Sequence, residues 1–281
     1  MPAPRARGVA SCDACAYKYL LGDARREAAR LRFQARLWDP TSHELFDRIG
    51  VRRGWTVLEV GPGPGSLHLE LRRRVKRPVD VVERSPVFAA SLARACRRDG
   101  FGAGRVWQTD LIKARLPRAA YDLIFVRWVF LFLPDPDAHI RMLVRALKPG
   151  GVLAIQDYHR ETLALVPRPP EWTRFMLADL AFFASQGGDA SIGGRLPRMY
   201  RRAGLTLEDI TVTVKTGHPG SATWRWLSTY FLGILDRYAA FPPFTRRDAV
   251  RLQRAWLAAA REKTSLLVGP ALLDVVGRKP R

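Results

Sequence analysis

The middle of the chain alternates short apolar runs with segments whose apolar residues recur at helical spacing. The runs predict buried strands, and the segments between them predict amphipathic helices. Strands are expected at Val57–Val60, Val79–Glu83, Arg105–Thr109, Tyr121–Val126 and Val152–Asp157. Helices are expected at Ser66–Val75, Val87–Asp99 and Ala138–Leu147. This alternation favours an α/β fold, with a doubly wound and mostly parallel sheet that carries helices on both faces.

The two ends of the chain depart from this alternation. Before it, residues 23–37 and 41–50 predict two helices. After residue 160, we expect helices at 172–185, 195–203 and 245–263, a strand at 205–215 and a last, antiparallel strand in the tail. The expected organisation is N-terminal cap helices over 1–48, a Rossmann-like core over 49–216, a helical insertion over 217–264 and a final core strand over 265–281.

The formal net charge of +21 raises the question of a polyanionic partner. Clustered cations bind nucleic acid by releasing phosphate counterions. Only seven of the 47 basic residues are lysines, however, and the arginines are scattered over many segments. Solvated surface is therefore favoured over nucleic-acid binding, which stays open as an alternative. No run reaches the ~20 apolar residues of a membrane span, and the N-terminus has no apolar signal region, so a cytoplasmic protein is expected.

The three cysteines do not predict a disulfide framework or a metal centre. Cys12 and Cys15 form a CxxC pair near the N-terminus, and Cys96 stands alone. A zinc site needs two further ligands, but the sequence has no second CxxC and no close histidine pair. We therefore expect no metal.

The most informative stretch is the turn after the first predicted strand, "VLEVGPGPGSL" at residues 57–67. Glycines at every second position followed by a helix are typical of nucleotide-binding turns. A dinucleotide fold places its pyrophosphate on backbone N–H groups, yet Pro62 and Pro64 have none to donate. Ser66 replaces the third glycine of that fingerprint, and Glu59 adds a negative charge. The turn therefore favours a ligand without phosphate that carries an ammonium and a sulfonium.

This turn resembles the first motif of the class I S-adenosylmethionine-dependent methyltransferases, and further motifs follow in the same order. "VDVVERSP" and "VWQTDL" are similar to the ends of the second and third strands, and "YDLIFVRWVFLFLPDP" to the fourth. "ALKPGGVLAIQDY" resembles the turn before the fifth strand and the strand itself. "YLLGDARREAARLRFQ" resembles the cap helix of the ubiquinone/menaquinone-type subgroup. The resemblance implies a Rossmann-like methyltransferase with S-adenosylmethionine as cofactor.

The resemblance also implies roles for individual residues. Glu83 matches the acid that grips the ribose hydroxyls, and a carboxylate can accept from both. Asp110 matches the acid that meets the adenine amino group, with the Leu111 N–H facing a ring nitrogen. A solvated acid and a helix N-cap are the respective alternatives. The remaining predicted cofactor residues are the turn glycines, the acid before them and the cap-helix pair: Gly61, Gly63, Gly65, Glu59, Tyr19 and Gln34.

Methyl transfer from a sulfonium is an in-line displacement, for which orientation alone can supply about 7–11 kcal/mol. A general base helps only if the acceptor retains its proton. The candidates follow the fourth and fifth strands: Arg127, Tyr158 and His159, of which His159 has the best ordinary pKa for a base. A solvent-facing role for this histidine remains the alternative. Phe132 occupies a position at which relatives often have histidine, which leaves the substrate chemistry open.

Three classes of function remain at this point. A small-molecule methyltransferase is favoured, because the aromatic insertion with Trp224, Trp226, Tyr230 and Phe231 suits a flat or apolar acceptor. These aromatics alternatively pack the insertion onto the sheet. An RNA or protein methyltransferase is supported by charge alone, and a non-catalytic cofactor-binding domain is the third class. A monomer or homodimer is expected.

Overall fold

The computed structural model of the protein describes residues 24–97, 100–102 and 104–281. Its α-helices are α1 (Ala24–Ile49), α2 (Ser66–Val75), α3 (Pro86–Cys96), α4 (Pro136–Ala146), α5 (Trp172–Ser185), α6 (Leu196–Arg202), α7 (Ala222–Tyr238) and α8 (Arg246–Ala259). Its strands are β1 (Val57–Val60), β2 (Asp80–Val82), β3 (Val106–Trp107), β4 (Tyr121–Arg127), β5 (Leu147–His159), β6 (Ala164–Val166), β7 (Thr206–Thr213), β8 (Thr216–Gly217), β9 (Leu266–Val268) and β10 (Ala271–Arg278). Tyr19, Cys12 and Cys15, for which roles were considered above, lie outside the described residues.

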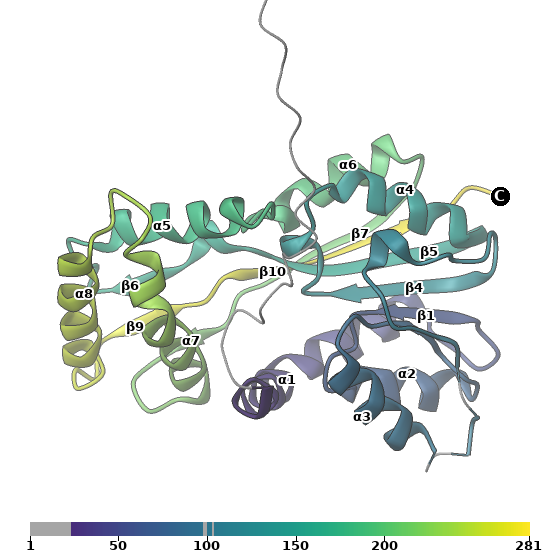
Figure 1. Cartoon of the computed structure of the whole chain (residues 1–281), viewed down its shortest axis with the longest axis horizontal. Helices are drawn as coiled ribbons and strands as arrows, with labels where there is room; N and C mark the ends of the chain where they lie inside the picture. Colours follow the sequence, from purple (N-terminus) through teal and green to yellow (C-terminus); the bar gives the residue numbers. More distant parts are fainter. Residues whose placement is uncertain (1–23, 98–99, 103) are drawn as a thin grey trace, which may run out of the picture.

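The central feature is a seven-stranded sheet in the order β3-β2-β1-β4-β5-β10-β7 (Figure 1). The first five strands run parallel to one another. The last strand, β10, lies between β5 and β7 and is antiparallel to both. The predicted α/β fold, mostly parallel with an antiparallel last strand, is therefore confirmed.

Helices cover both faces of this sheet (Figure 1). On one face, Phe46 of α1 and Leu71 of α2 pack with Phe125 of β4 in a single apolar cluster. On the other face, Leu143 of α4 and Met199 of α6 join a second, larger cluster. The central strands are buried from both sides, which explains why they read as continuous apolar runs rather than as alternating ones.

The N-terminal part forms one helix where the sequence predicted two. Helix α1 continues from Ala24 to Ile49 with Pro40 inside it. Proline usually interrupts a helix, because it lacks an N–H and crowds the preceding turn. Here the residues on either side are held by tertiary burial, since Trp38 and Ser42 are both fully buried. Packing against the core therefore overrides the local stop signal.

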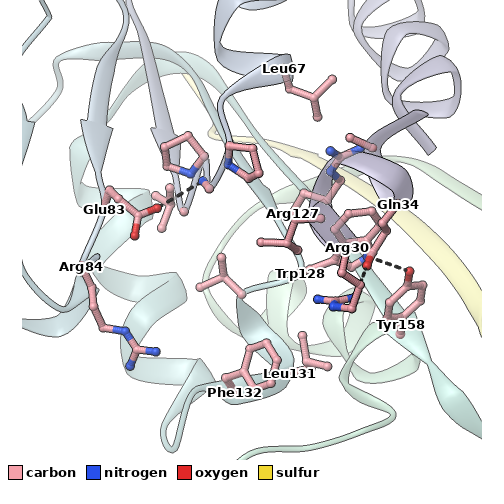
Figure 2. Close-up of a pocket in the computed structure, with 18 of the residues that line it drawn as sticks. Arg30, Gln34, Leu67, Glu83, Arg84, Arg127, Trp128, Leu131, Phe132 and Tyr158 are labelled. Carbon is pink, nitrogen blue, oxygen red and sulfur yellow. Dashed lines mark hydrogen bonds between the residues drawn. The ribbon is translucent and has the colours of Figure 1, made fainter. Parts of the chain in front are cut away.

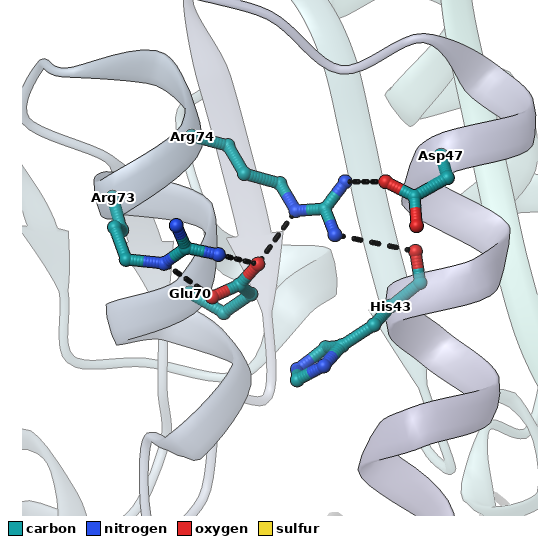
Figure 3. Close-up of polar contacts among 5 residues, drawn as sticks. All are labelled: His43, Asp47, Glu70, Arg73 and Arg74. Carbon is teal, nitrogen blue, oxygen red and sulfur yellow. Dashed lines mark hydrogen bonds and ion pairs between the residues drawn. The ribbon is translucent and has the colours of Figure 1, made fainter.

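An arginine fixes α1 against α2 (Figure 3). The Nε of Arg74 donates to Glu70 on its own helix at 2.6 Å. The Nη1 of Arg74 pairs with Asp47 of α1, and its Nη2 donates to the backbone oxygen of His43 at 3.4 Å. These contacts hold the C-terminal half of α1 beside α2, the helix that follows the glycine turn.

Strand β5 is longer than predicted because it includes the "KPGG" segment, which we expected to form a turn before it. The strand begins at Leu147 and ends at His159. Its pairing with β4 shifts between Tyr121 and Leu123, so "KPGG" forms an irregularity inside the ladder. Gly151 allows this close approach, because a Cβ there would lie 2.8 Å from the Tyr121 oxygen.

A second lobe lies beyond the carboxyl ends of the core strands (Figure 1). It combines α5, α7 and α8 with a three-stranded antiparallel sheet in the order β6-β9-β8. Phe231 of α7 joins the three helices, with ring centroids 5.5 Å from Phe175 of α5 and 5.8 Å from Trp256 of α8. Helix α5 and strand β6, which precede the expected insertion in the sequence, thus also pack against it. None of the helices in the described part of the chain is long and apolar enough to cross a membrane.

Candidate functional site

A pocket of about 310 Å³ lies where the carboxyl ends of β1, β2, β4 and β5 face α1 and α7 (Figure 2). This is the edge at which open α/β sheets bind their ligands. The volume is within the range of small-molecule sites. The pocket is lined on one side by the glycine turn and on the other by aromatic side chains of α7.

The three glycines of the turn all adopt left-handed backbone conformations. Their φ angles are +68° at Gly61, +54° at Gly63 and +87° at Gly65. A side chain in this region costs about 1–2 kcal/mol. Gly61 and Gly65 are also close to neighbours, since an added Cβ would lie 2.5 Å from Val129 and 2.6 Å from Leu92. The space around Gly63 is open, so that part of the turn is accessible to a ligand.

We expect Gly61→Ala to lower the free energy of unfolding by at least about 1 kcal/mol more than Gly63→Ala does. Both residues have a positive φ, but only the Gly61 substitution overlaps Val129. Chemical denaturation of the two variants measures the difference. The double variant Gly61→Ala/Val129→Ala should recover part of the loss, and equal losses for the two single variants would contradict this account.

Glu83 follows β2 and is held by the glycine turn (Figure 2). Its Oε1 accepts from the Ser85 N–H at 2.7 Å, and its Oε2 accepts from the Gly63 N–H at 3.2 Å. The side chain is buried, and this burial raises the pKa of the carboxyl. Each oxygen has a further lone pair, so the fixed carboxylate can accept two neighbouring hydroxyls from the pocket.

Glu59 also lines the pocket, but a buried histidine holds it from behind. Its Oε2 lies 2.9 Å from Nδ1 of His68 on α2. Burial acts to lower the pKa of His68, but hydrogen bonds to Cys96 and Glu59 and the charge of Glu59 raise it to about 9. At neutral pH His68 is therefore an imidazolium, and its hydrogen bond sets the position of Glu59.

The raised pKa of His68 predicts a loss of stability in mild alkali. A histidine whose pKa rises from 6.5 to about 9 on folding stabilises the fold fully below pH 6.5. This contribution, on the order of 3 kcal/mol, is lost as the pH rises toward 9. Urea denaturation between pH 6 and 10 should show a decline for the native protein that His68→Gln lacks. Parallel pH profiles for both proteins would refute the assignment.

Asp110 and Leu111 lie at the far end of the pocket from α7. Leu111 is buried, whereas the Asp110 side chain is 53% exposed and lies 3.7 Å from Nη1 of Arg84. Asp110 occupies the N-cap position of a short 3-10 turn, but its side chain makes no capping hydrogen bond. Its carboxylate is therefore accessible to an amino group in the pocket.

The predicted cap-helix residue Gln34 is buried in the pocket wall (Figure 2). Its Oε1 accepts from Nη1 of Arg30 at 2.7 Å, and its Nε2 donates to the hydroxyl of Tyr158 at 3.5 Å. Helix α1 is thus connected to the end of β5 across the pocket. Burial raises the pKa of Tyr158, so its hydroxyl stays protonated at neutral pH and is a donor rather than a base.

The end of β4 contributes a strained tryptophan. Trp128 has a φ of +55°, and such strain in a bulky residue costs about 1–3 kcal/mol and is concentrated at functional sites. Its ring stacks on Tyr158 with centroids 5.6 Å apart, and the Arg127 guanidinium lies 4.3 Å from its centroid. Arg127 itself donates to Asp39 at 2.8 Å and to Ser42 at 3.0 Å. Arg127 and Tyr158, which the sequence offered as candidate catalytic residues, therefore both line the pocket.

His159 is not part of this arrangement. The pocket lining includes Tyr158 and Arg160 but not the histidine between them. Successive side chains of a strand point to opposite faces, and Nδ1 of His159 lies 3.5 Å from the Ser191 oxygen. The structure therefore does not bring the expected base to the other site residues.

Comparisons with known proteins agree with this geometry. A methyltransferase domain family matches residues 58–155. The chain is 33% identical over 135 residues to the uncharacterized methyltransferase YdaC of Bacillus subtilis (strain 168), a match that covers 48% of this chain and 73% of YdaC. It is 28% identical over 149 residues to the ubiquinone/menaquinone biosynthesis C-methyltransferase UbiE of Azotobacter vinelandii (strain DJ / ATCC BAA-1303). This second match covers 52% of this chain and 58% of UbiE. The cyclase SpnF superposes with a TM-score of 0.55 at 21% identity, over 86% of this chain and 80% of its own, which shows a shared fold alone.

The chain belongs to the class I S-adenosylmethionine-dependent methyltransferases. The predicted resemblance is thus confirmed, and S-adenosylmethionine is the cofactor of this methyltransferase. The residues present fit that molecule. Glu83 offers free lone pairs for two ribose hydroxyls, and Asp110 an acceptor for an amino group. The prolines of the turn offer no N–H to a phosphate, and S-adenosylmethionine has no phosphate.

Sequence reasoning missed several polar residues of the methyltransferase pocket, among them Arg30, Arg84 and Thr109. The most buried of the missed polar residues is Arg160. It lies in the 3-10 turn Arg160–Thr162 directly after β5 and is 4% exposed. No motif marks it, because its partner Asp179 comes from α5 in the second lobe. The aromatic wall was anticipated more closely: Trp226, Tyr230 and Phe231 line the pocket, whereas Trp224 does not.

Proposed function

We propose that this protein transfers a methyl group in line from S-adenosylmethionine to a small, aromatic or apolar molecule. The observation that carries the proposal is a single pocket that continues from the glycine turn and Glu83 to a wall of Trp226, Tyr230 and Phe231. Aromatic walls of this kind suit flat or apolar ligands. The name of the related UbiE, a C-methyltransferase of quinone biosynthesis, agrees with an acceptor of this type.

The proposed mechanism relies on orientation rather than on acid–base catalysis. When bound, S-adenosylmethionine supplies an electrophilic methyl group. No histidine, cysteine or lysine lines the pocket in the part of the chain described, and Tyr158 stays protonated. Helices α1 and α7 cover the site and exclude water, while Trp128 and Tyr158 limit the positions open to the acceptor. Such positioning can account for about 7–11 kcal/mol of the barrier.

The proposal is tested by the formation of S-adenosylhomocysteine from S-adenosylmethionine. The purified protein is incubated separately with a mixture of small aromatic compounds, with total RNA and with a protein extract. We expect product with the small molecules only. Transfer to RNA or protein alone would favour the class suggested by the net charge of +21. Failure of the protein to bind S-adenosylhomocysteine in calorimetry would favour a non-catalytic role. Cytoplasmic location and a monomeric or homodimeric state stay predictions.

A further inference from the structure

The charged residues of the pocket are sorted between its two ends. Three carboxylates line it at one end. They come from the end of β1 (Glu59), the end of β2 (Glu83) and the turn after β3 (Asp110). Among the arginines, Arg84 faces Asp110 at that same end. The other three arginines of the lining belong to α1, the end of β4 and the turn after β5: Arg30, Arg127 and Arg160. The end that faces the cationic cofactor is thus acidic, and the opposite end is basic.

Arg160 is the most completely enclosed of these cations. Its Nε and Nη2 donate to the two oxygens of Asp179 at 2.9 and 2.6 Å, and the Tyr238 hydroxyl also bonds Asp179. The guanidinium carbon lies 5.0–5.3 Å from the ring centroids of Phe183, Tyr230 and Phe231. Burial acts to lower the pKa of Arg160, but Asp179 raises it well above its ordinary value, so the group stays charged.

One nitrogen of this guanidinium has no partner. Nη1 of Arg160 makes no hydrogen bond to any residue in the described part of the chain, although the side chain is 96% buried and lines the pocket. The ion pair with Asp179 joins the turn after β5 to α5 and α7, but this structural role needs only Nε and Nη2. Nη1 is not one of the fully buried unpaired atoms of the described residues, so it faces the open space of the pocket and is available to an acceptor group that enters there.

We infer that the methyl acceptor carries a carboxylate and that Nη1 of Arg160 binds one of its oxygens. This inference rests on the proposed function and names the class of substrate, an aromatic carboxylate. The rings around the guanidinium suit the flat part of such a molecule. A single charge fits better than a phosphate dianion, because Arg127 is already paired with Asp39 and Arg160 with Asp179, so each of these two pairs is neutral as a whole. Arginine also matches the geometry of a carboxylate.

The probes that test this are benzoate and benzamide, which have nearly the same shape but differ in charge. Each is titrated calorimetrically into protein saturated with S-adenosylhomocysteine. We expect the native protein to bind benzoate about tenfold more tightly than benzamide, or better. The variant Arg160→Gln/Asp179→Asn keeps an uncharged, hydrogen-bonding pair and should bind the two probes equally. Arg160→Lys, which keeps the charge but has no Nη1, is the second variant and should also lose the preference.

The matched control is Arg254→Gln, which removes one positive charge from the exposed face of α8 and should leave the preference unchanged. Thermal melting and affinity for S-adenosylhomocysteine, measured on every variant, verify folding and the cofactor site. Equal binding of both probes to the native protein, no benzoate binding at all, or a preference retained without Arg160 would overturn the inference. If the native protein did not bind S-adenosylhomocysteine at all, that result would instead contradict the proposed function.

Discussion

Asp179→Asn should lower the free energy of unfolding by about 3–5 kcal/mol. The substitution leaves the Arg160 guanidinium buried without its counter-charge, and the Tyr238 hydroxyl loses a charged acceptor. Both groups lie between β5, α5 and α7 and are almost completely inaccessible to water. Replacing one partner of a buried ion pair costs more than the pair itself contributes, because the remaining charge cannot be solvated. Urea denaturation monitored by tryptophan fluorescence measures the change.

Asp137→Asn provides the matched control for this variant. Asp137 also accepts two hydrogen bonds from an arginine, Arg202, at 2.7 and 2.8 Å, but both side chains of this pair are partly exposed. An exposed pair contributes at most about 1 kcal/mol. The double variant Arg160→Gln/Asp179→Asn should be more stable than Asp179→Asn alone, since no isolated charge remains. Similar losses for Asp179→Asn and Asp137→Asn would mean that water reaches Arg160.

Glu83→Gln should weaken binding of S-adenosylhomocysteine by about 1.5–3 kcal/mol, which corresponds to roughly 10- to 150-fold in affinity. The carboxylate oxygens are fixed by the N–H groups of Gly63 and Ser85 and have lone pairs left for the ribose hydroxyls. Glutamine has only one acceptor oxygen at this position and a donor in place of the other. Calorimetric titration measures the loss. The control Glu44→Gln removes the same charge from an exposed position on α1 and should bind like the native protein.

The raised pKa of Glu83 sets the pH dependence of this binding. Burial makes the carboxyl protonate at a higher pH than an exposed glutamate would. A group whose pKa rises on folding stabilises the fold in its protonated form, so ionised Glu83 costs some stability at neutral pH. Glutamine removes that cost but loses a backbone hydrogen bond, and the net change in stability should stay within about 1 kcal/mol. The affinity of the native protein for S-adenosylhomocysteine should fall as the pH is lowered. The affinity of Glu83→Gln should depend less on pH. Identical profiles would exclude Glu83 as the titrating group.

The part of the pocket around the glycine turn was largely predictable, because its residues are close together in the sequence. Gly61, Gly63 and Gly65 share one turn, and Glu83 follows the next strand, so strand–turn–helix order alone brings them to one edge of the sheet. Their conformations are also local, since a positive φ at three alternate residues selects glycine whatever the surroundings are. The same locality explains why Asp110 at the next strand end could be anticipated.

The end of the pocket opposite the glycine turn was much less predictable, because it is formed by residues that only the tertiary structure brings together. Arg160 becomes a pocket residue through Asp179, which lies 19 residues later in the chain on a helix of the second lobe. The adjacent His159 was the expected base, but the alternation of side chains along β5 directs it away from the pocket. No property of the two residue types indicates which of them faces inward.

The sequence by itself determined the order of strands and helices from β1 to β5, the glycine turn and the acid that faces it, because apolar periodicity and backbone conformation are local properties. Only the tertiary structure decided that α1 continues through Pro40, since the burial of Trp38 and Ser42 outweighs a local helix stop. It likewise decided that α5 joins α7 and α8 over the pocket. These features depend on burial energies summed over segments distant in the chain, which no window of the sequence contains.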